Sequence, residues 1–208
     1  MKKLLLAGIL ASVSVAPAFA AGGNFRVEAR AGYDSIKLTL DYDDGEDQVT
    51  DSGSEDGIVY GAEIGYDFDF GGQFAGPYAS FDLSNTKACY EEAGLWKECL
   101  KARRNIAVGI RAGIGSADGL RGYVKVGYVN GRIRYAYEDF EDATENWSDS
   151  AGRDGLQLGA GLEYPFGSMA YGKVEYLYND YKKFDIVDPI LTGDVSRHQV
   201  VAGVGVRF

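Results

Sequence analysis

The sequence predicts an all-β fold, an eight-stranded antiparallel up-and-down transmembrane β-barrel. Three observations predict it: an export leader, eight segments with an apolar residue at every second position, and links that are alternately short and long. After the leader, no stretch reaches the roughly 20 apolar residues that a membrane helix needs. A closed barrel is the other structure that satisfies its backbone hydrogen bonds in lipid.

The first 20 residues have the pattern of a cleavable signal peptide. Lys2 and Lys3 precede an apolar stretch from Leu4 to Val15, and Ala18-Phe19-Ala20 then supplies the small residues that a signal peptidase reads. The apolar stretch is too short for a membrane anchor, and position 21 is not a lipid-accepting cysteine. We therefore expect cleavage after residue 20 and one barrel domain over residues 21–208, in the outer membrane of a Gram-negative cell.

Eight segments alternate apolar residues with polar residues or glycine. Their apolar faces span residues 25–33, 58–68, 77–83, 106–114, 124–128, 156–164, 170–178 and 200–208. A helix would need apolar residues three and four positions apart, which these segments lack. The opposite face is rich in glycine with a few ions, which suits a narrow lumen, and aromatic residues end the apolar face at Tyr66, Tyr164 and Phe208. The apolar face is therefore predicted to meet lipid.

The links alternate in length as an up-and-down barrel requires. Short links at 69–74, 116–119 and 166–168 are predicted on the periplasmic side, together with both termini. Long polar links at 43–57, 85–102, 136–154 and 182–196 are predicted outside the cell.

Two places interrupt the alternation. Beyond Tyr33 the apolar positions shift to Ile36 and Leu38, which predicts a β-bulge near Asp34-Ser35. Beyond Tyr128, Asn130-Gly131 is typical of a tight hairpin, which would make ten strands, or of a second bulge. The hairpin would leave spanning strands of roughly seven residues, shorter than the 9–11 typical of membrane strands, so the bulge is preferred.

These features resemble the small outer-membrane barrels of the opacity-protein and outer-membrane-protein-A-like family. The stretch 173–181 is similar to the penultimate strand of that family, and the ending 204–208 resembles the signal read by the outer-membrane assembly machinery, with Phe208 last. The chain stops at Phe208, so we expect no periplasmic peptidoglycan-binding domain. The resemblance implies a structural or surface role, or a small pore.

Ten charged residues are predicted to point into the lumen. They are Arg26, Glu28, Arg30, Glu63, Arg111, Lys125, Glu163, Lys173, Glu175 and Arg207. An eight-stranded barrel is only wide enough for its side chains to fill it, and unpaired buried charges are costly. We expect an ion-pair network that seals the barrel; the alternative is a gate that opens by exchange of partners.

The long links contain the other candidate residues. Cys89 and Cys99 predict a disulfide, since the exported chain meets an oxidising environment and no histidine lies near enough for a metal site. Acidic stretches at 43–56 and 138–149 lack the ligand spacing of a calcium loop and are predicted to be solvated and flexible. No cofactor or metal is predicted.

An enzymatic reading depends on His198, the only histidine. Ser196 and Asp194 lie on the same predicted face, but the order is the reverse of the His-before-Ser motif of lipid A deacylases. No glycines suited to an oxyanion hole lie beside it. The prediction is therefore a non-enzymatic structural or surface-interaction barrel, with a small porin-like channel as the first alternative and a lipid A-modifying enzyme as the second.

The predicted partners follow from this location and charge. They are outer-membrane lipid and lipopolysaccharide, the assembly machinery, and an unidentified extracellular partner of the long links. Nucleic acid is excluded as a partner, because the net charge is −10 and nucleic-acid binding depends on cations that neutralise phosphates.

Overall fold

The computed structural model describes residues 23–43, 45, 48–92, 95–116, 118–140, 144, 146–187 and 191–208. The predicted signal peptide, residues 1–20, lies outside these ranges. The strands are β1 (Gly23–Asp43), β2 (Gln48–Asp69), β3 (Gln73–Ser84), β4 (Lys87–Glu92), β5 (Trp96–Gly115), β6 (Arg121–Asp139), β7 (Trp147–Pro165), β8 (Ala170–Tyr181), β9 (Phe184–Val187) and β10 (Leu191–Arg207). No helix in the described part of the chain is long and apolar enough to cross a membrane.

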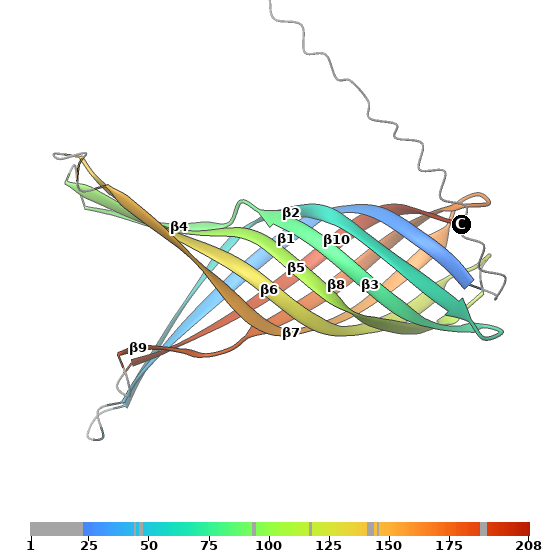
Figure 1. Ribbon diagram of the computed structural model, residues 1–208, viewed down its shortest axis with the longest axis horizontal. Helices are drawn as coiled ribbons and strands as arrows, with labels where there is room; N and C mark the ends of the chain where they lie inside the picture. The colour runs from blue at the N-terminus through green and yellow to red at the C-terminus, as the bar shows by residue number, and fades with distance from the viewer. Residues whose placement is uncertain are drawn as a thin grey trace, which may run out of the picture.

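Eight of these strands form the wall of a closed barrel (Figure 1). Each pairs antiparallel with its neighbours in the order β1-β2-β3-β5-β6-β7-β8-β10, and β10 pairs with β1 to close the sheet. The short strands β4 and β9 pair only with β5 and β10, in the link regions. The predicted fold class, an eight-stranded up-and-down barrel, is confirmed.

The alternation along β5 shows how the sequence selects this fold. Val108, Ile110 and Ile114 point outward and are 49–68% exposed, whereas Asn105, Ala107 and Arg111 point inward and are almost completely buried. Outward apolar and inward polar side chains require lipid outside and a filled lumen inside.

Tight turns join the strands at one end of the barrel. Gly71 and Gly72 adopt positive φ values of 77° and 97° between β2 and β3, and Gly167 has φ 95° between β7 and β8. The Asp69 carboxylate accepts a hydrogen bond of 2.8 Å from the Gly71 amide, which closes the first turn. The start of β1 and the C-terminal residue meet at the same end, since the Phe25 amide donates to the Phe208 carbonyl at 3.1 Å. The predicted short links and common side of the termini agree with this arrangement.

At the other end the strands continue beyond the barrel in two arms, where polar links were predicted (Figure 1). The first arm consists of the described residues of 36–57 and 182–197, around β1, β2, β9 and β10. The second arm consists of the described residues of 86–104 and 131–154, around β4–β7. The arms separate because β3 and β8 end at Ser84 and Tyr181, while neighbouring strands stay paired as far as Asp43↔Gln48 and Tyr137↔Trp147.

The predicted bulge near Asp34-Ser35 is wrong. β1 pairs without interruption with both β2 and β10 through these residues. The apolar positions shift because the surroundings of β1 change along its length. Within the barrel wall, before Asp34, the outer face of the strand meets lipid. Beyond Ser35, in the arm, the outer face meets water and the inner face becomes apolar. Ile36 and Leu38 accordingly pack against a buried cluster that includes Val129 and Val195.

The predicted irregularity at Asn130-Gly131 is also wrong, both as a hairpin and as a bulge. β6 is continuous, and its register with β7 runs unbroken from Arg121↔Glu163 to Tyr137↔Trp147. The register shift lies on the neighbouring strand β5, between Ala102 and Asn105, where two residues face one residue of β6.

Candidate functional site

All ten charged residues predicted to face the lumen lie inside the barrel. Nine of them are at most 4% exposed, and the Arg207 side chain is 10% exposed. They come from seven of the eight wall strands. β1 supplies three of them, Arg26, Glu28 and Arg30. The structure therefore brings residues far apart in sequence into one buried cluster.

Glu63 and Glu175 form the centre of this cluster. Lys125 Nζ lies 2.5 Å from Glu63 Oε2 and 3.0 Å from Glu175 Oε1, and Arg30 Nη1 lies 2.9 Å and 3.1 Å from the same two carboxylates. Lys173 adds a contact of 3.1 Å to Glu175 and a close ion pair to Glu28. The two central carboxylates thus share their cations across the lumen.

A second group lies toward the tight turns and is centred on Arg111. This guanidinium forms a two-pronged contact with Asp67, at 2.9 and 2.5 Å, and reaches Glu163 at 3.0 Å. Arg121 lies 3.3 Å from Glu163, and Arg207 makes a close ion pair with it. Paired contacts of this kind fix both orientation and charge.

A third group of ions lies toward the arms. The sequence analysis did not predict it. Arg197 makes a two-pronged contact with Asp34, at 2.5 and 2.7 Å, and Thr86 donates to the same carboxylate at 2.8 Å. Arg30 makes the same kind of contact with Asp82, at 2.9 and 2.7 Å. Strand parity placed Asp34, Asp67 and Asp82 on the inner face, so parity applied to every carboxylate would have included them.

The missed residues bring the interior close to neutrality. The predicted set held six cations and four carboxylates; Arg121 and Arg197 add two cations, and Asp34, Asp67 and Asp82 add three carboxylates. A near balance is what burial demands, because an uncompensated charge in a low-dielectric interior costs several kcal/mol.

Aromatic rings fill the space between the ions. Lys125 Nζ lies 3.9 Å from the centre of the Tyr78 ring, and Arg121 lies 3.7 Å from that of Phe74. The rings fit because glycine faces them: a Cβ at Gly161 would lie 2.5 Å from Tyr123 Cζ. The same arrangement recurs in the lumen, where a tyrosine ring on one strand packs against a glycine on another, as for Tyr171 and Gly205.

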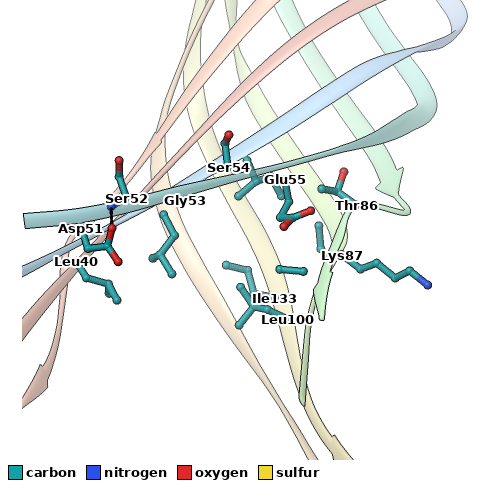
Figure 2. A pocket seen from close by; sticks show the side chains of 14 residues that line it. Leu40, Asp51, Ser52, Gly53, Ser54, Glu55, Thr86, Lys87, Leu100 and Ile133 are labelled. Carbon is teal, nitrogen blue, oxygen red and sulfur yellow. Dashed lines mark hydrogen bonds between the residues drawn. The ribbon is translucent and has the colours of Figure 1, made fainter. Parts of the chain in front are cut away.

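A cleft of about 230 Å³ lies above the ion network, between the two arms (Figure 2). Ile36, Leu38 and Leu40 of the first arm face Leu100 and Ile133 of the second. Asp51 and Glu55 lie at the rim. The mouth of the barrel is therefore apolar on its walls and charged at its edge.

The second half of the chain matches a known family. Residues 100–208, which are more than half of the chain, match the outer membrane protein beta-barrel domain. The chain belongs to this family. Its place is therefore the outer membrane of a Gram-negative cell, and the exposed apolar belt of the barrel meets lipid there.

Relatives of this outer-membrane barrel are known in sequence and in structure. The chain is 29% identical over 201 residues to the 31 kDa outer-membrane immunogenic protein of Brucella melitensis, and equally to that of Brucella suis, covering 90% of this chain and 83% of each relative. Among solved structures, Neisserial surface protein A is 16% identical with a TM-score of 0.49, covering 88% of this chain and 97% of that one. The attachment invasion locus protein Ail of Yersinia pestis is 18% identical with a TM-score of 0.45, covering 88% and 98%.

The second arm of the barrel contains the two cysteines. Cys89 and Cys99 are joined in a disulfide and occupy directly paired positions of β4 and β5. On β6 and β7, the rings of Tyr135 and Trp147 lie 5.1 Å apart. The Tyr135 hydroxyl donates to Glu98, which raises the pKa of Tyr135 to about 12. The arm is thus a cross-linked, aromatic-rich sheet, where a polar link was predicted.

The acidic stretches lie in the two arms. Much of 43–56 belongs to the β1–β2 hairpin, so this stretch is a paired sheet in its described part and not a flexible loop. Within the described residues, no three metal-binding side chains of the His, Cys, Asp or Glu type come together.

Ser196, His198 and Asp194 lie on one face of β10, and His198 and Asp194 contact residues other than one another. His198 Nδ1 lies 2.7 Å from the Tyr176 hydroxyl, and the His198 ring lies 5.0 Å from the ring of Tyr178. The Asp194 carboxylate instead lies 3.6 Å from Lys183 Nζ. The histidine therefore belongs to an aromatic group on the outer surface of the barrel.

Proposed function

We propose that this outer-membrane barrel is a non-enzymatic, sealed scaffold whose two arms present an interaction surface outside the cell. The observation that carries the proposal is the central network, in which Glu63 and Glu175 share Arg30 and Lys125 across the lumen. The ions lie in three groups along the lumen, and aromatic rings fill the spaces between them. An ion crossing the barrel would have to break several buried pairs in succession.

The arms supply the surface for a partner. Aromatic side chains are enriched in protein interfaces, and the second arm carries Tyr135, Tyr137, Trp96 and Trp147 in two ring pairs. The Brucella relatives are named as immunogenic outer-membrane proteins, which supports a role at the cell surface for this chain as well. The predicted extracellular partner is not identified, and we propose that it fits between or against the arms.

Conductance of the refolded barrel in a planar bilayer tests the seal. We expect a folded barrel, identified by its heat-dependent gel mobility, that gives no channel steps. Reproducible steps that change in size in Glu63→Gln would overturn the sealed scaffold and establish a pore gated by the central ions.

The small pore is the second candidate, and one feature favours it. Arg26 Nη1 lies 3.5 Å from both Glu28 and Glu63, and Lys173 Nζ lies 3.9 Å from Glu63 in addition to its closer partners. Cations with alternative partners nearby can exchange between them without passing through an unpaired state. A pore would use this exchange as its gate.

Shortening one arm tests the surface role separately. In the first arm, Asp41 pairs with Thr50, so residues 42–49 can be replaced by an Asn-Gly turn without disturbing the barrel. We expect the shortened protein to insert normally and to lose binding of cells to host surfaces or to antibody raised against intact cells. Unchanged binding after shortening of each arm would contradict the proposal.

Export and insertion are proposed to use the two ends of the chain. Residues 1–20 would be removed as a signal peptide, and Phe208, which is exposed at the end of β10, would be read by the assembly machinery. We expect Phe208→Ala to reduce the inserted amount in cells while the purified chain still refolds in detergent. Mass spectrometry of the mature protein checks cleavage after residue 20.

A further inference from the structure

Six cations gather on the outer surface of the second arm, next to the lipid-facing belt. This outer basic patch consists of Lys87 on β4, Lys101, Arg103 and Arg104 on β5, and Arg132 and Arg134 on β6. It stands out because the chain as a whole carries a net charge of −10. The ion network in the lumen uses none of these charges, and Lys87 alone of the six borders the cleft, with its side chain directed away from it.

The pairing of the strands places the six side chains in two adjacent rows. Lys101 is directly paired with Lys87 on one side and with Arg134 on the other. The register shift in β5 sets Arg103 and Arg104 together against Arg132. The irregularity thus concentrates three guanidinium groups where a regular ladder would hold two.

The patch points away from the lumen. Ala102 and Asn105, which flank the shift, are 7% and 0% exposed on the inner face, so the two arginines between them share the outer face. Figure 2 shows the Lys87 side chain directed away from the cleft. The outer face of these strands changes from apolar to cationic within about two residues of Ile106, or roughly 7 Å along the strand.

Folding does not account for this arrangement. Like charges directly opposite each other on paired strands destabilise a sheet. Among the described residues, no carboxylate lies within ion-pairing distance of these six cations, although the cations of the lumen are paired with carboxylates. Within the described ranges, the hydrogen-bond partner of Arg134 is a neutral group, the Ser148 hydroxyl, at 2.8 Å. On the same face, Asp154 accepts hydrogen bonds from Tyr128 and Asn130.

We propose that the outer basic patch binds the phosphate groups of lipopolysaccharide in the outer leaflet. Arginine matches the geometry of phosphate with paired hydrogen bonds, and clustered cations beside a bilayer attract anionic lipid headgroups. The position at the edge of the apolar belt is the height at which those phosphates lie, while the acyl chains pack on Ile106, Val108 and Phe81 below. The lipid holds the second arm against the membrane surface.

Binding of phosphorylated lipid A to the refolded full-length mature barrel tests this proposal. The test variant is Arg103→Gln/Arg104→Gln/Arg132→Gln. The matched control, Lys37→Gln/Lys182→Gln/Lys183→Gln, removes the same charge from the first arm. We expect the test variant to lose about tenfold or more in affinity and the control to lose little. Arg103→Lys/Arg104→Lys/Arg132→Lys should restore most of the binding, which a purely structural role of these residues would not do.

Two further measurements identify the ligand. Dephosphorylated lipid A should bind the wild-type barrel as weakly as phosphorylated lipid A binds the test variant, and added salt should weaken only the phosphate-dependent binding. Equal loss in the test and control variants, or equal binding of dephosphorylated lipid A, would overturn the proposal. Binding of soluble heparin with no binding of lipid A would also overturn it, and would assign the patch to sulfated glycans.

Discussion

Glu63 and Glu175, on the non-adjacent strands β2 and β8, share one guanidinium nitrogen: Arg30 Nη1 lies 2.9 Å from the first and 3.1 Å from the second. Lys125 Nζ joins the same two carboxylates. A cross-link of this kind ties the barrel together through its lumen, in addition to the hydrogen bonds of its wall. Removing one charge therefore affects every partner at once.

Glu63→Gln should destabilise the barrel strongly. The substitution keeps the size of the side chain but leaves Lys125 and Arg30 with a carboxylate too few in a buried site, which costs about 3–5 kcal/mol when a buried pair is broken. Urea unfolding of the barrel refolded in lipid vesicles measures the change. Glu91→Gln is the control, since its pair with Lys97 is exposed and contributes at most about 1 kcal/mol. Equal effects of the two substitutions would mean that the lumen is hydrated enough to screen its charges.

Removing both partners should cost less than the single changes predict. In Glu63→Gln/Lys125→Met, the lost carboxylate is matched by a lost cation, so the remaining charges return to near balance. We expect a double-mutant cycle on unfolding free energies to give a coupling of about 1–3 kcal/mol between the two positions. Additive losses would show that Glu63 and Lys125 act independently, against the geometry of the 2.5 Å contact.

Strand parity predicted the barrel because lipid and lumen impose opposite demands on successive residues. The same rule gave wrong predictions near Ile36 and Ile133, where the change of parity was interpreted as a bulge or a hairpin. A change of parity arises either from an inserted residue or from a change of solvent outside the strand, and the sequence looks the same in both cases. Only the uninterrupted register of β1 with β10 and of β6 with β7 distinguishes them.

The candidate site was predictable as a set of inward charges but not as pairs. Parity places Arg30 inside, yet its partner Glu175 lies 145 positions away in the chain, on the non-adjacent strand β8. Which charges meet depends on the stagger between non-adjacent strands across the lumen, and this has no local signal. The outer basic patch was missed for a related reason, because its six cations become neighbours only through the pairing of β4, β5 and β6.

Gly161→Ala should destabilise the barrel by overfilling the lumen. The new methyl group would lie 2.5 Å from Tyr123 Cζ, and the ring cannot withdraw without breaking its 3.2 Å hydrogen bond to Glu175. Overpacking of this kind costs about 1–3 kcal/mol. Gly53→Ala is the matched control, since a Cβ at that position meets no atom within 4 Å. The same vesicle unfolding measurement applies, and an unchanged Gly161→Ala barrel would mean that the rings pack loosely.

Removing the disulfide should loosen the second arm and leave the barrel folded. Cys89 and Cys99 join β4 to β5, and β4 has no other partner in the wall of the barrel, so the bond holds the hairpin and not the membrane-spanning strands. Closing a loop of this size contributes at most about 3 kcal/mol. We expect Cys89→Ser/Cys99→Ser to keep the heat-dependent gel mobility of the barrel and to be cleaved faster by external protease between residues 87 and 101. Loss of the folded band would show instead that the arm is needed for barrel assembly, and unchanged protease resistance would show that the hairpin is stable without its cross-link.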